Sequence, residues 1–97
     1  MDALYSGPEQ YRLDRVSESF QTLRRWTNLS DIDALIVSRW LVRGDPRLSV
    51  LQVATVQIAP LSARGRRTLR YLQDMGAVEA WFWICSLPLY REKVYLP

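Results

Sequence analysis

Apolar side chains recur at helical spacing near the start of the chain, with polar ones between them. A helix over residues 9–27 is predicted because a set of apolar side chains, three or four residues apart, shares one of its faces: Leu13, Val16, Phe20, Leu23 and Trp26. Residues 1–8 are expected to form a loose tail before this helix, because the turn-forming pair Gly7-Pro8 marks its end.

A second helix is predicted from residue 31 to residue 43. Ser30 can cap its N-terminus, and Asp31 and Asp33 in its first turn suit the positive end of the helix dipole. Gly44 follows at the position where glycine often ends a helix. This segment therefore has a start signal, a stop signal and an apolar face between them.

The next segment has turn signals and a third helix. Asp45-Pro46 predicts a turn, and residues 47–48 are expected to form a very short strand. Ser49 can cap a helix over residues 50–57. Residues 58–61 then form a second turn, because Pro60 lacks the N–H group that a continuing helix would use.

A fourth helix is predicted over residues 63–75. Ser62 caps its N-terminus, and Gly76 ends it in left-handed geometry. Wound as a helix, this segment places Leu69 and Leu72 on one side and most of its arginines on the other.

After Gly76 the apolar period changes from that of a helix to that of a strand. Residues 77–85 are rich in β-forming side chains, residues 86–89 predict a turn, and residues 90–96 predict the partner strand of a hairpin. The strand over residues 77–85 is apolar on both faces, which implies a cover. That cover is either the N-terminal helix or another subunit, so Trp81 and Trp83 face one or the other.

The net charge of +3 falls on the middle of the chain. Residues 1–43 and 77–97 are each balanced, whereas residues 44–76 hold five arginines against Asp45 and Asp74. The excess positive charge therefore coincides with the third and fourth predicted helices.

Several classes of function are excluded by composition. The chain has no histidine and a single cysteine, Cys85, so the usual zinc sites and histidine-based catalysis are excluded, and we expect no enzyme, no metal and no cofactor. No apolar run is long enough to cross a membrane, and the N-terminus lacks the apolar core of a signal peptide. A lone cysteine among apolar neighbours predicts an inert buried thiol and a cytoplasmic protein.

The predicted order of elements resembles the winged helix-turn-helix family of transcription regulators, of the ArsR-like and MarR-like kind. Val53-Ala54 is similar to the apolar and small pair of the family's first motif helix. SARGRRTLRYLQDMGAV over residues 62–78 is similar to its recognition helix and closing glycine, and residues 92–96 to the return strand of its wing. Gly65 departs from the family, which has a core valine there.

The resemblance implies an α+β, mostly helical fold in one domain over residues 9–97. Its parts would be an N-terminal dimerisation helix over residues 9–28, a helix-turn-helix over residues 49–75 and a wing hairpin over residues 77–97.

The resemblance also implies a small DNA-binding transcription regulator that places the 62–75 helix in the major groove of double-stranded DNA. The residues expected to contact DNA are Ser62, Arg64, Arg66, Arg67, Arg70, Arg91 and Lys93. A homodimer is expected, because regulators of this type mostly bind as twofold dimers. The residues expected at its interface are Leu13, Val16, Phe20, Leu23 and Trp26.

Alternatives stay open for each of these features. The basic helix face can be a solvated surface, and the N-terminal stripe can pack within its own chain. The second function compatible with the pattern is a winged-helix module for protein–protein assembly that uses the aromatic hairpin and does not bind DNA.

Overall fold

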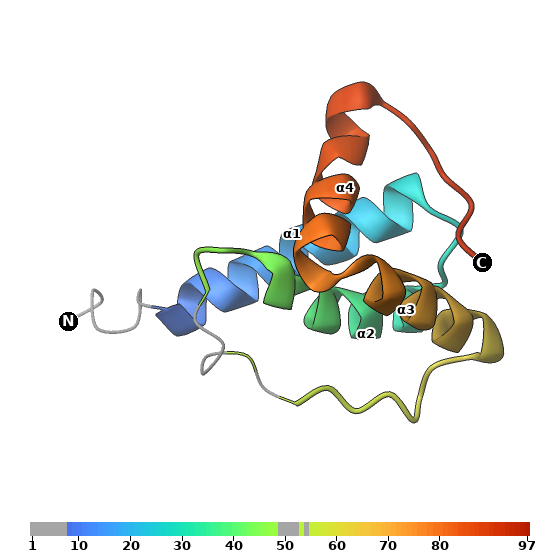
Figure 1. The fold of residues 1–97 in the computed structure, drawn as a ribbon, viewed down its shortest axis with the longest axis horizontal. Coiled ribbons are helices and arrows are strands. Elements are labelled where there is room, and N and C mark those ends of the chain that lie inside the picture. The colour runs from blue at the N-terminus through green and yellow to red at the C-terminus, as the bar shows by residue number, and fades with distance from the viewer. Residues whose placement is uncertain (1–7, 49–52, 54) are drawn as a thin grey trace.

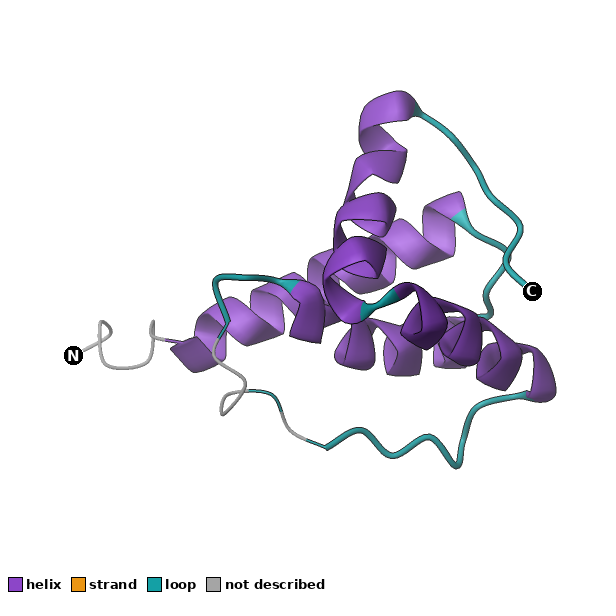
Figure 2. Ribbon diagram, viewed as in Figure 1, coloured by secondary structure: helices purple, strands orange, loops and turns teal. Residues whose placement is uncertain are grey.

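The computed structural model describes residues 8–48, 53 and 55–97, and within these residues the secondary structure is entirely helical (Figures 1 and 2). The elements, in chain order, are α1 (Pro8–Trp26), α2 (Asp31–Leu41), the 3₁₀ helix η2 (Val42–Gly44), α3 (Ala63–Met75) and α4 (Ala77–Tyr90). The expected α+β fold with a wing hairpin is therefore wrong for the described part of the chain.

The first two predicted helices are confirmed. α1 and α2 pack side by side, and Leu23 of α1 and Val37 of α2 are fully buried between them and the rest of the core. Ser30 caps α2 as predicted, since the Asp33 backbone N–H donates to its hydroxyl at 3.4 Å. The capping signal of Ser30 in the sequence therefore agrees with the start of α2 in the structure.

Gly44 has a different role from the helix-ending one predicted for it. A Cβ atom at this position would lie 1.9 Å from the Ala77 carbonyl oxygen and 2.6 Å from the Cβ of Trp81. Glycine is therefore required because η2 passes directly against the first turn of α4. This close approach helps to bury Trp81 in the core.

The segment expected to form the first strand of the hairpin is α4. Ile84 follows Ala80 and Trp81 by four and three residues, Leu87 follows Ile84 by three, and all four are buried on one side of the helix, against α1, η2 and α3. An apolar run without clear alternation fits either a strand covered on both faces or a buried helix. The helix is favoured here because a single face meets the core along its length.

Residues 91–97 are not a strand but a segment without regular structure that lies on the corner between α1 and α2. The Val94 N–H donates to the Trp26 carbonyl at 2.9 Å. The Asn28 side chain donates to the Leu96 carbonyl at 3.0 Å and accepts from the Leu96 N–H at 2.8 Å. These bonds satisfy the backbone that a hairpin partner would otherwise have paired.

The predicted helix-turn-helix lacks its first helix in the described residues. Residues 49–52 and 54 lie outside them, and Val53 and residues 55–58 are not helical. The second turn is confirmed, since the Leu61 N–H donates to the Ile58 carbonyl at 2.9 Å. Residues 47–48 are not a strand but part of a turn that the Leu48 N–H closes on the Asp45 carbonyl at 3.0 Å.

The C-terminal end of α4 has the backbone geometry that commonly ends a helix. Arg91 has φ 52° and ψ 43°, the left-handed conformation that glycine adopts most readily. Its N–H donates to the Pro88 carbonyl at 3.3 Å, and the Glu92 N–H donates to the Leu87 carbonyl at 3.1 Å. This pair of bonds is the Schellman pattern of helix ends.

We expect Arg91→Gly to raise the free energy of unfolding by about 0.5–1 kcal/mol. Glycine has no Cβ atom, so it adopts the left-handed conformation without the steric clash that arginine has there. Urea unfolding followed by circular dichroism measures the change. Glu92→Gly is the matched control and should not stabilise the protein. A loss of stability on Arg91→Gly would contradict the end of α4 at this residue.

Candidate nucleic-acid interface

α3 is an amphipathic helix with arginines along its outer face. Gly65, Thr68, Leu69 and Leu72 are buried on its inner side. The arginines on it are all exposed to solvent: Arg64, Arg66, Arg67 and Arg70. With 13 residues the helix is about 20 Å long, so these guanidinium groups lie within one short surface.

No described carboxylate forms an ion pair with these arginines. The ion pairs of α1, Arg15–Glu18 and Arg24–Asp31, each with an N–O distance of 2.8 Å, lie elsewhere on the molecule. Arg66 donates from Nη2 to the Ala59 carbonyl at 3.2 Å, which orients one guanidinium without neutralising it. The outer face of α3 therefore keeps its positive charge.

The position of these arginines on the helix is electrostatically unfavourable within the chain. The first turn of α3 has no acidic residue, and Arg64, Arg66 and Arg67 lie close to its positive N-terminal end. A cation at that end destabilises a helix by about 0.3–1 kcal/mol when exposed. The Asp33 carboxylate lies at this end and offsets part of the repulsion, and an anion bound on the outer face would offset more of it.

The N-terminus of α3 is fixed on α2 by a buried carboxylate. Asp33 is 2% exposed and accepts from the Ser62 N–H at 3.0 Å and from the Ser62 hydroxyl through its other oxygen. The same hydroxyl accepts from the Gly65 N–H at 3.0 Å, which is the predicted cap. Ser62 was expected to contact DNA, but its N–H and its hydroxyl already have partners inside the protein.

Gly65 is explained by the same carboxylate. A Cβ atom on Gly65 would lie 2.5 Å from Oδ1 of Asp33, closer than such contacts occur in proteins. The position that resembles a core valine of winged-helix proteins is therefore a glycine because Asp33 occupies the space. The glycine is visible in the sequence, but the sequence does not show which residue of α2 faces it.

Arg91 and Lys93 do not join the arginines of α3. Both are exposed, but they follow α4, which runs away from α3 for about 20 Å (Figure 1). The Lys93 Nζ lies 5.9 Å from the centre of the Tyr95 ring. The set of residues expected to contact DNA is thus divided between two separate parts of the surface.

The apolar stripe of α1, expected at a dimer interface, lies largely in the core of its own chain. Val16 and Leu23 are buried, Phe20 and Trp26 are half-buried, and Leu13 is exposed. Packing against α2 within one chain accounts for most of this stripe.

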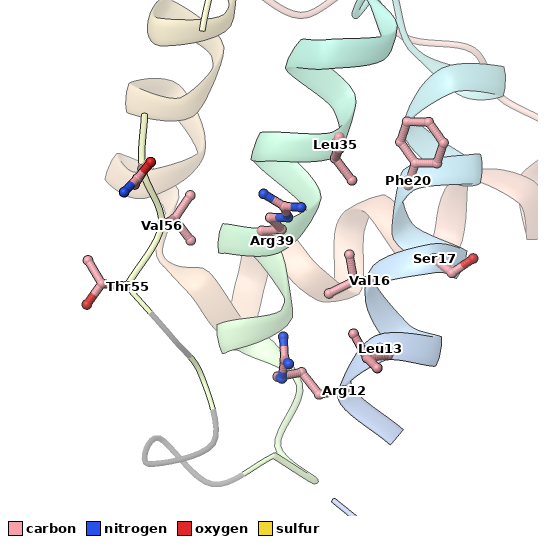
Figure 3. A pocket seen from close by; sticks show the side chains of 10 residues that line it. Arg12, Leu13, Val16, Ser17, Phe20, Leu35, Arg39, Thr55 and Val56 are labelled. Carbon is pink, nitrogen blue, oxygen red and sulfur yellow. The ribbon is translucent and has the colours of Figure 1, made fainter. Parts of the chain in front are cut away.

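The exposed edge of the α1 stripe lines a groove of about 670 Å³ between α1, α2 and residues 55–57. Figure 3 shows Leu13, Val16 and Phe20 on one wall, with Leu35 and Arg39 of α2 and Val56 beyond them.

The open question about the two tryptophans is answered within the described residues. Trp81 is buried in the core, and Trp83 is half-buried with its ring edge against Tyr71 of α3, at a centroid distance of 6.4 Å. Both rings therefore pack against their own chain. The apolar residues of α4 that remain exposed are different ones, which the strand prediction had placed in a hairpin.

Cys85 is exposed, in contrast to the buried thiol expected from its apolar neighbours. It borders two hollows between α1 and α4. Partial burial there, together with the negative charges of Asp45 and Glu18, raises the pKa of the thiol to about 11, and Arg15 acts in the opposite direction. The thiolate is therefore scarce at neutral pH.

We expect Gly65→Ala to destabilise the protein by about 1–3 kcal/mol, although alanine favours a helix interior by about 1 kcal/mol over glycine. The added Cβ would displace the Asp33 carboxylate from Ser62. Urea unfolding measures the change, with Gln73→Ala on the exposed side of α3 as the control. In an Asp33→Ala background the same substitution should lose most of its effect, and a stabilising Gly65→Ala would contradict the contact.

We expect Cys85 to react slowly with iodoacetamide at pH 8. The raised pKa lowers the thiolate fraction, and the greater nucleophilicity of that thiolate offsets only part of the loss, so alkylation should be roughly tenfold to a hundredfold slower than in the urea-unfolded chain. The pH profile of the native rate should have its midpoint near pH 11. A native midpoint at or below pH 9 would contradict this environment. Mass spectrometry of protein at low concentration follows the reaction.

Comparison with known proteins adds no relative to this description. No family model, no curated protein and no solved structure matches the chain. Within the described residues, no helix combines the length and the apolar character that crossing a membrane requires.

Proposed function

We propose that this chain is a small cytoplasmic DNA-binding regulator that contacts double-stranded DNA through the outer face of α3. The observation that carries the proposal is the set of four exposed arginines on one helix, against the single carboxylate of Asp74 and without an ion pair to any described carboxylate. Arginine is the side chain best suited to phosphate and to the guanine edge, because its planar group donates two hydrogen bonds at once.

The rigidity of α3 supports this proposal. Its inner face is anchored in the core by Leu69 and Leu72, and its N-terminus is held by Asp33. Arginines on a fixed helix lose less conformational freedom on binding than arginines on a loop. The major groove is wide enough to admit such a helix.

The absence of a wing in the described residues changes the kind of binding that we expect. Arg91 and Lys93, the predicted wing contacts, lie away from α3, so contacts come from a single helix. Such an interface depends mainly on phosphate charges, which give affinity without much sequence preference. Any specificity would come from Arg64, Arg66 and Arg67, near the N-terminal end that probes base edges.

Salt dependence of DNA binding tests the proposal. If each of the four arginines neutralises one phosphate, the logarithm of the binding constant should fall with the logarithm of salt concentration at a slope of about −3 to −4. The triple variant Arg66→Ala, Arg67→Ala and Arg70→Ala should reduce the slope to about −1 and lower the affinity at low salt by at least about tenfold. Fluorescence anisotropy on a labelled random-sequence duplex measures both quantities.

A matched triple variant controls for net charge. Arg12→Ala, Arg24→Ala and Arg25→Ala remove the same number of charges from α1 and should leave the slope nearly unchanged. Equal binding by the wild-type chain and the α3 variant would show that the arginine face is only solvated. Equal loss in both triple variants would show that overall charge, and not α3, attracts the DNA.

A further inference from the structure

α4 exposes an apolar stripe on the side that faces away from the core. Val78, Phe82, Cys85 and Leu89 follow one another at intervals of four, three and four residues, which places them on one line along the helix. Val78 and Phe82 are each 56% exposed, and Leu89 is 81% exposed. We refer to these four residues as the α4 stripe.

The α4 stripe differs from the outer faces of the other long helices. α1 and α3 present mainly charged and amide side chains to solvent, whereas the only charged side chain within α4 is Glu79. Single exposed apolar residues are common, but a continuous line of them on one helix marks a surface that another molecule covers. The alternation of four and three residues is the spacing at which two helices pack along a seam.

A hollow of about 420 Å³ lies beside the α4 stripe, between α4 and α1. Its α4 wall is formed by Trp81, Ile84, Cys85 and Pro88. Its α1 wall is polar and is formed by Ser17, Glu18, Ser19, Gln21 and Thr22. Phe82 and Leu89 protrude beside this hollow, and its α4 wall offers an apolar surface to the same side chains of a second copy. A surface that carries both a knob and its socket is complementary to itself about a twofold axis.

The charges at the two ends of α4 indicate the same arrangement. Glu79 lies in the first turn, and Arg91, Glu92 and Lys93 follow the last turn with a net charge of +1. In an antiparallel pair of α4 helices, Glu79 of one copy lies toward the basic end of the other, and the helix dipoles are opposed. A parallel pair would bring like charges and like dipoles together.

We infer that a second copy of this chain covers the α4 stripe, with the two α4 helices antiparallel about a twofold axis. One helix from each chain forms a small interface, at the low end of the roughly 1,200–2,000 Å² that stable complexes bury. The dimer should therefore dissociate in the micromolar range. This inference does not depend on DNA binding, and it places the dimer on α4 instead of on the α1 stripe.

Sedimentation equilibrium from low micromolar to several hundred micromolar protein, without DNA, tests the inference. The wild-type chain should pass from monomer to dimer over this range. Phe82→Glu and Leu89→Glu should each stay monomeric, because a carboxylate would be buried at the seam without a partner. The control Ile32→Glu changes an apolar residue of α2 that is 60% exposed and should dimerise like the wild type.

Circular dichroism of each variant verifies that it is folded, and all these side chains are exposed, so folding should be retained. A wild-type chain that is monomeric at every concentration would overturn the inference and leave the stripe to another partner. So would Phe82→Glu and Leu89→Glu chains that are folded and still dimerise with wild-type affinity.

Charge reversal tests the antiparallel arrangement. Glu79→Lys and Arg91→Glu should each weaken the dimer by about two- to fivefold, as expected for exposed ion pairs, and the double reversal should restore most of the affinity. Losses that add in the double variant would contradict the pairing of Glu79 with the basic end of the other α4.

Discussion

The contact between the Asp33 carboxylate and the N-terminus of α3 determines where the basic helix lies. The described residues between η2 and α3 contain no helix or strand. Leu69 and Leu72 set how deeply the helix packs, but apolar contacts are not directional. The hydrogen bonds from Ser62 to a buried carboxylate are directional, and they fix the end of the helix at one place on α2.

Gly76 joins the basic helix to the apolar one through a single residue. Its N–H donates to the carbonyls of Leu72 and Gln73, and its own carbonyl accepts from the Ala80 N–H at 2.9 Å. Its φ of 102° lies in the region that disfavours side chains other than glycine. The two surfaces with proposed partners, the arginine face of α3 and the α4 stripe, therefore belong to helices that adjoin at one corner of the molecule (Figure 1).

The elements with local signals could be predicted from the sequence. α1, α2 and α3 have amphipathic patterns, and Ser30 and Ser62 cap helices as their positions indicate. α4 could not be predicted because its face outside the core is also apolar, so no period separates a helix from a doubly covered strand. The prediction of a partner strand over residues 90–96 depends on the same assignment and is wrong with it, since Tyr90 ends α4 and residues 91–97 have no regular structure.

The candidate site was predictable only in part. The four arginines follow from the helical period, and the structure places them on one exposed face. The hydrogen bonds from Ser62 to Asp33 could not be predicted, because these residues are 29 positions apart in the sequence. Local patterns report which face of a helix is polar, but they do not report which distant side chain meets it.

The bonds between Asn28 and Leu96 close a loop of 68 residues. Closing a loop of this length carries an entropic penalty that only later contacts repay, so such a contact forms late in folding. The corner between α1 and α2 lies near the start of the chain. The Asn28 side chain and the Trp26 carbonyl at this corner form these hydrogen bonds only when residues 94–96 are in place. During synthesis, the Asn28 side chain and the Trp26 carbonyl thus lack these partners until residues 94–96 have left the ribosome, so the end of α1 is completed only after the other described helices have been made.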